Sequence, residues 1–254
     1  GMPAFQDVLK AVSAAWRSKR GEIVENSKGI VGYMQQGDDF VDKLQSRALS
    51  IDTLTKAAHN LERNFDRARG GWGSAPKFPQ PMTLEFLIRS YAQSIQNPAG
   101  DSEPPGGSAD RTTIDLTLTA MARGGMYDQL GGGFHRYSTD ANWLVPHFEK
   151  MLYDNSQLAR VYLHAYQTFD TPFYKRIATE ILDYVAREMT QPDGGFYSTQ
   201  DADSEGAEGK YFVWSVDEVR SILGDDALLF NEVYGVTPNG NFHDEHSGLR
   251  GSVL

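Results

Sequence analysis

The chain has 254 residues, of which 40% are hydrophobic and 23% charged, as in ordinary globular proteins. Its formal net charge of −10 argues against nucleic acid and anionic membranes as partners, because phosphate binding needs a basic surface. It contains no cysteine, which excludes disulfide and thiol chemistry here, and no apolar run approaches the roughly 20 residues of a membrane span. We expect a cytoplasmic protein without a cofactor.

Apolar residues recur at helical spacing in most long segments of the chain. Asp52 is placed to cap the second of these segments, and Pro79 and Pro81 mark the boundary before the third. The predicted helices cover residues 5–34, 54–65, 84–95, 114–122, 148–162, 174–185, 216–223 and 228–233.

Glycines followed by a large side chain separate several of these helices. Such glycines permit positive φ at helix exits and a close approach of the backbone in structured loops. The pattern occurs at Gly70-Gly71-Trp72, Gly124-Gly125-Met126-Tyr127, Gly131-Gly132-Gly133-Phe134 and Gly194-Gly195-Phe196. Helix, glycine-rich loop, helix is the order that a ring of helical hairpins requires. We therefore predict a mainly α fold, an (α/α) toroid over residues 1–254 as a single domain or a fragment of one. An ordinary helical bundle is the alternative.

Three segments interrupt the helical pattern. Residues 97–110 have almost no apolar content and are predicted to form a flexible loop. Segments 196–199 and 210–214 flank an acidic connection and are predicted to pair as a small β-hairpin insertion. Residues 243–246 are expected to form a loose tail.

Polar and aromatic side chains are densest between Tyr127 and Asn155. Carbohydrate sites use such mixtures, because sugar faces pack on rings while hydroxyls pair with carboxylates, Arg and His. The alternative is that the rings are buried and the charges solvated. The catalytic candidates are Asp128, His135, His147, Glu149 and Asp154, and the substrate-binding candidates are Trp72, Lys77, Arg136, Trp143, Tyr153, Asp201 and Asp203.

His147 follows Pro146, a residue suited to the first position of a helix. The dipole at a helix N-terminus opposes the imidazolium and would keep His147 neutral, with Asp154 about two turns further on the same face. We expect His135, after three glycines, to be exposed at the loop mouth.

The acidic segment from Asp201 to Gly206 resembles the start of a calcium loop. However, Phe212 stands where the twelfth-position glutamate is needed. We therefore expect a solvated hairpin tip and no metal.

Three blocks resemble the spermatogenesis-associated protein 20 family, whose bacterial members are YyaL-type thioredoxin domain-containing proteins. They are GGWGSAPKFPQP (70–81), GGMYDQLGGGFHRYSTDANWLVPHFEKMLYDNSQLA (124–159) and GGFYSTQDADSEGAEGKYFVW (194–214). The resemblance implies an N-terminal thioredoxin-like domain, absent from this chain, joined to a part similar to six-hairpin glycosidases and N-acylglucosamine 2-epimerases. It also implies an incomplete ring, since about eight helices are predicted where six hairpins need twelve. It implies no established activity.

Two functions remain open from the sequence. The first is a carbohydrate-active enzyme, either an epimerase with His135 and His147 as acid and base or a glycosidase with two carboxylates from Asp128, Glu149, Asp154 and Asp201. In the epimerase version Arg136 and Trp143 hold the sugar. The second is a non-catalytic binding or regulatory module attached to the thioredoxin-like domain. Convergence of the two histidine rings on one pocket would favour the epimerase.

Overall fold

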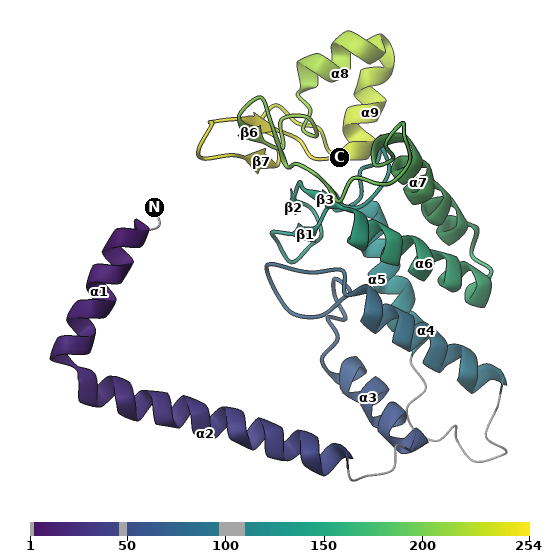
Figure 1. The fold of residues 1–254 in the computed structure, drawn as a ribbon. Coiled ribbons are helices and arrows are strands. Elements are labelled where there is room, and N and C mark those ends of the chain that lie inside the picture. Colours follow the sequence, from purple (N-terminus) through teal and green to yellow (C-terminus); the bar gives the residue numbers. More distant parts are fainter. Residues whose placement is uncertain (1–2, 46–49, 97–109) are drawn as a thin grey trace. The chain divides into compact units, whose positions relative to one another are not determined.

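The computed structural model describes residues 3–45, 50–96 and 110–254, and its contacts divide the chain into two units, residues 1–51 and 52–254 (Figure 1). The first unit contains α1 (Phe5–Ser18) and α2 (Arg20–Gln45). The prediction of a single helix over residues 5–34 is therefore wrong in two respects. The helix is interrupted at Lys19, and α2 continues beyond residue 34 to Gln45. Ser18 bonds back to the carbonyl of Ala14 beside this break, and Gly21, a weak helix former, follows it. The prediction of one domain over residues 1–254 stays a prediction.

The second unit is built mainly of helices. They are α3 (Ile51–Arg63), α4 (Pro81–Gln96), α5 (Arg111–Arg123), α6 (Leu152–Phe169), α7 (Pro172–Glu188), α8 (Val216–Leu223) and α9 (Ala227–Tyr234). Only Asp170, in the left-handed region at φ 50°, and Thr171 connect α6 to α7, and Pro172 starts α7. Helix α6 packs along α7 and against α4, which also contacts α5. The mainly α class is confirmed, whereas the closure of its helices into an (α/α) toroid stays a prediction.

The apolar faces predicted from periodicity form one core between these helices. Its fully buried members include Leu84, Leu87, Ile114, Leu118, Leu158, Tyr162, Ile177 and Ile181. Residues three or four apart on each helix lie on one face, and that face is removed from water. This core is the base on which the loops between α5 and α6 rest. None of the described helices is long and apolar enough to cross a membrane.

Short antiparallel strand pairs lie in the loops. The pairs are β1 (Tyr137–Ser138) with β2 (Pro146–His147), β3 (Lys150–Met151) with β4 (Thr199–Gln200), β5 (Asp203–Ser204) with β6 (Ala207–Glu208), and β7 (Phe242–His243) with β8 (Arg250–Gly251). The β-hairpin insertion exists, but its strands are β5 and β6 rather than segments 196–199 and 210–214.

The flanks of that hairpin pair with distant parts of the chain, since Thr199 lies opposite Met151 and Trp214 bridges to Ser252. The loose tail expected at 243–246 is also wrong, because Asp244 accepts hydrogen bonds from the backbone of His246 and Ser247 in the turn between β7 and β8. Of the loop predicted at 97–110, residues 97–109 lie outside the described residues, and Asp110 caps α5 through the amide of Thr112.

Candidate functional site

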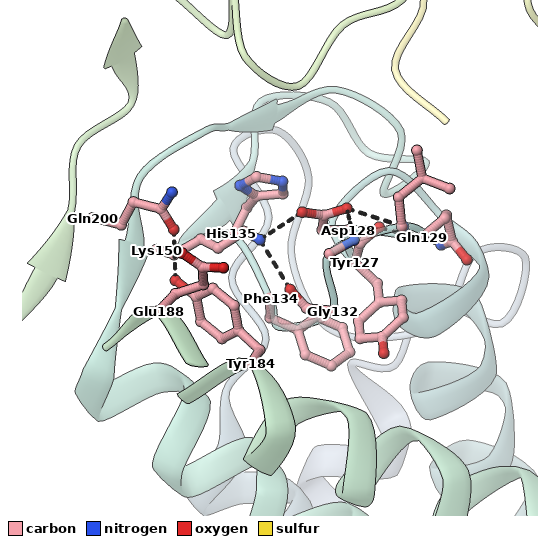
Figure 2. A network of polar contacts seen from close by, with 12 residues as sticks. Tyr127, Asp128, Gln129, Gly132, Phe134, His135, Lys150, Tyr184, Glu188 and Gln200 are labelled. Carbon is pink, nitrogen blue, oxygen red and sulfur yellow. Dashed lines mark hydrogen bonds and ion pairs between the residues drawn. The ribbon is translucent and has the colours of Figure 1, made fainter. Parts of the chain in front are cut away.

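A buried lysine organises the loop between α5 and α6. Lys150 donates to Asp128 Oδ2 at 2.7 Å and to the carbonyl of Gly132 at 2.9 Å (Figure 2). Asp128 Oδ1 accepts from the amides of Leu130 and Gly131. Burial opposes the charge of Asp128, but the Lys150 ammonium holds the pKa of this carboxyl below its ordinary value. Because both of its oxygens are bound inside the protein, Asp128 holds the loop in place and is not a free acid or base.

His135 is buried, with 2% of its surface exposed, which corrects the expectation of an exposed residue at the loop mouth. Its ring packs edge-on against Phe148 and Phe212, with centroids at 5.4 and 4.7 Å. Nδ1 lies 2.8 Å from the Phe148 carbonyl oxygen. Since a carbonyl can only accept, Nδ1 carries the hydrogen and Nε2 is left as an acceptor. Burial, together with the Lys150 cation, lowers the pKa of His135 to about 3.

Asn155 ties the same loop to the start of α6. Its Oδ1 accepts from the Phe134 amide at 2.7 Å, and its Nδ2 donates to the carbonyls of Phe134 and Met151, both at 3.0 Å. The side chain is fully buried. The amide group thus replaces the missing backbone partner of Phe134 and fixes the loop relative to the helix.

A second group of polar side chains comes together where β2, β3 and α6 meet. We call it the acid–base cluster: Arg136, His147, Glu149, Asp154 and Glu208. Glu149 accepts from Arg136 at 2.8 Å and lies 3.7 Å from His147 Nε2. His147 Nδ1 lies 2.7 Å from Glu208 Oε1. Four of these five residues were predicted as site residues, and Glu208 was missed.

Asp154 differs from the other members of the cluster because it is 7% exposed and its Oδ2 has no hydrogen-bond partner among the described residues. Burial raises the pKa of Asp154 to about 6 against the opposing effect of Arg136, and the charge of Glu149 adds to the rise. Asp154 and Glu149 are thus two neighbouring carboxyl groups in different environments, one buried and short of partners, the other paired with a cation. Tyr153, also predicted, lies half-exposed beside them.

The position of His147 corrects its predicted role. It lies in β2 opposite Tyr137, and α6 begins only at Leu152. The argument from a helix dipole therefore does not apply to His147. Its ring stacks on Tyr137 at 5.2 Å, and Glu208 fixes its orientation through Nδ1.

The remaining predicted residues do not join the cluster. Trp143 and Lys77 are completely buried. Trp143 donates to the carbonyl of Arg69, Trp72 donates to that of Leu61, and Lys77 pairs with Asp66 at 2.8 Å. These three side chains hold loops on the core and offer a ligand little or no surface. Asp201 and Asp203 are exposed, the first just before β5 and the second within it, and no group of three or more His, Cys, Asp or Glu in the described ranges is arranged to hold a metal.

His135 lines a cavity of about 440 Å³ beside the loop between α5 and α6. Its walls include Gln129, Arg187, Glu188, Tyr211 and Trp214 together with His135. Apart from Asp128 and His135, no residue predicted for the site lines it. His147 is not among the residues that line this cavity, so the two histidines do not share it.

No protein-family model matches the chain. Spermatogenesis-associated protein 20 of Homo sapiens is 37% identical over 93% of this chain, and the protein of the same name from Mus musculus is 36% identical over 94%. The chain spans only 31% and 32% of the length of these relatives.

Two solved structures are similar to part of this chain. Cellobiose 2-epimerase from Spirochaeta thermophila has 16% identity and a TM-score of 0.43, covering 59% of this chain and 40% of its own. A sugar epimerase from a ruminal bacterium has 10% identity and a TM-score of 0.42, covering 68% and 45%.

Proposed function

This chain belongs to the spermatogenesis-associated protein 20 family, and for the part of the family's length that it spans we propose a carbohydrate-active function, with Asp154 and Glu149 of the acid–base cluster as acid and base. The observation that carries this proposal is the difference between the two carboxyl groups. Asp154 is buried with one oxygen short of a partner among the described residues, whereas Glu149 is paired with Arg136, and enzymes assign different roles to two carboxyl groups through such differences in environment.

In the proposed reaction the two carboxyl groups cleave a glycosidic bond. Asp154 keeps its proton to a higher pH than an ordinary aspartate and would give it to the departing oxygen as the bond to the sugar carbon breaks. Glu149, beside Arg136, would take a proton from the water that attacks that carbon. An epimerase that uses His135 and His147 is less well supported, because His135 is buried beside the cavity and His147 does not line that cavity.

Aromatic side chains next to the cluster support a sugar as the substrate. Phe78 and Tyr153 are each 47% exposed. Phe78 packs on Tyr137 at 4.9 Å, and Tyr137 in turn stacks on His147. Rings beside a few oriented polar groups are typical of small-ligand sites.

The test is hydrolysis of a panel of aryl glycosides by the chain and by Asp154→Asn and Glu149→Gln. Removal of either group should lower kcat about 100-fold or more, whereas Asp201→Asn, an exposed carboxylate outside the cluster, should leave it unchanged. Activity that requires protonated Asp154 should fall as the pH rises through about 6.

Turnover that survives both substitutions would overturn the assignment of acid and base. Saturable sugar binding without turnover would instead favour the alternative, a binding module attached to a thioredoxin-like domain.

A further inference from the structure

The cavity beside His135 is not explained by the acid–base cluster, because none of the five cluster residues lines it. We propose that this cavity is a second ligand site and that it binds a neutral sugar of one or two rings. Its volume of about 440 Å³ lies within the range of small-molecule sites. The proposal does not depend on the chemistry assigned to Asp154 and Glu149.

The inner wall of the cavity presents acceptors that lack partners. The buried His135 ring uses Nδ1 for the Phe148 carbonyl, and its Nε2 has no partner in the part of the chain that the structure describes. The Gln129 amide donates to the carbonyls of Ala122, Gly124 and Tyr127, so that its Oε1 is also left as an acceptor. Neither atom is among the described side-chain atoms that are buried and lack a partner, so both acceptors remain accessible to solvent. A ligand that displaces water from them without supplying a donor would leave them unpaired, at a cost of about 1–3 kcal/mol each. A hydroxyl group replaces the lost hydrogen bond, whereas an apolar group does not.

The charged side chains that line the cavity are balanced in sign. Arg187 donates through Nε to Glu188 at 2.8 Å and through a second nitrogen to the carbonyl of Gly131. It keeps further N–H groups for a ligand, and Glu188 keeps one carboxylate oxygen. Asp128 in the wall is neutralised by Lys150. A ligand therefore meets both donors and acceptors but no excess of either sign, which favours a neutral molecule over a cation or an anion.

Aromatic rings complete the walls. Tyr211 is 72% exposed, and Phe212 and Trp214, which also line the cavity, are half-buried. A molecule with hydroxyls at its edges and C–H groups on its faces satisfies both the acceptors and the rings. A pyranose has this form.

The direct test is NMR of the chain, which has 6 histidines, during titration with methyl β-D-glucopyranoside. Binding in the cavity should move the Nε2 nitrogen resonance of His135 saturably, because a hydroxyl now donates to it. Glucosamine and glucuronate, which carry a positive and a negative charge on a similar ring, should bind more weakly. An unmoved His135 signal at millimolar sugar, or tighter binding of a charged analogue, would overturn the proposal.

Substitutions separate this site from the acid–base cluster. Tyr211→Ala should weaken the binding measured at His135 by about tenfold. Because the Tyr211 side chain is largely exposed, its removal should not disturb the fold. Tyr197→Ala removes another exposed tyrosine that does not line the cavity, and it should have no effect. Asp154→Asn should abolish any turnover and leave the His135 response intact. Equal weakening by Tyr197→Ala and Tyr211→Ala would count against the cavity as the binding site.

Discussion

Replacing Asp154 by asparagine should stabilise the folded chain at neutral pH. In the folded state the pKa of Asp154 is raised from 3.8 to about 6, so the folded protein binds this proton more tightly than the unfolded chain does. Stability from this group is therefore fully present below pH 3.8 and is lost as the pH rises towards 6.

The size of the effect follows from the shift. At 1.36 kcal/mol for each pH unit, a rise in the pKa of Asp154 from 3.8 to about 6 corresponds to about 3 kcal/mol at pH 8. At pH 4 most of the stability contributed by protonated Asp154 is still present. Asparagine has nearly the same shape and carries no charge, so the gain in stability of Asp154→Asn over the wild type should grow by about 2.5 kcal/mol between pH 4 and pH 8.

The assay is urea unfolding, followed by tryptophan fluorescence, of the wild type and the variant at intervals from pH 4 to pH 8. Comparing the two chains at each pH cancels the titration of the other groups. A difference in unfolding free energy that does not depend on pH would refute the reasoning, because it would show that Asp154 titrates alike in the folded and unfolded states. Asp201→Asn, an exposed carboxylate, serves as the control and should give a small difference at every pH.

Two further predictions concern the loop that carries the site. Lys150→Met leaves Asp128 buried without its cation and should lower the free energy of unfolding by about 3–5 kcal/mol, measured by the same unfolding assay; a loss below 1 kcal/mol would show that the pair contributes little. Gly133 has φ +78°, and a Cβ there would lie 2.4 Å from the Tyr184 ring. Gly133→Ala should therefore destabilise the chain by about 2–5 kcal/mol, whereas Gly194→Ala, at φ +91° with nothing within 4 Å, should cost only the backbone strain of about 1–2 kcal/mol.

The helices could be predicted from the sequence because a helix buries one face, and that requirement is visible in local spacing. The start of α6 could not. The pattern of Phe148, Met151 and Leu152 fits a helix, but residues 146–151 are held extended by pairing with residues 137–138 and 199–200. Pairing between segments far apart in the sequence leaves no local periodicity, so the prediction of a helix start at Pro146 is wrong.

The site, like the helices, could be predicted from the sequence only in part. The concentration of charged and aromatic residues between 127 and 155 correctly indicated where polar side chains gather, and Arg136, His147, Glu149 and Asp154 do come together. Burial was harder to predict, because it depends on contacts from elsewhere: Phe212 covers His135, and the backbone of Arg69 receives the indole N–H of Trp143. Glu208 gave no signal as a partner of His147, since 61 residues separate them.

Asn155 restricts what the chain can place at that position. Its carboxamide uses an acceptor and two donors at once; aspartate would bring like-charged oxygens against two carbonyls, and glutamine is one carbon too long to stay in register. Hydrogen bonding alone therefore limits the position to a single residue type. Asn155 follows Asp154 directly, so the hydrogen bonds that fix this amide also fix the backbone that carries the neighbouring carboxyl group.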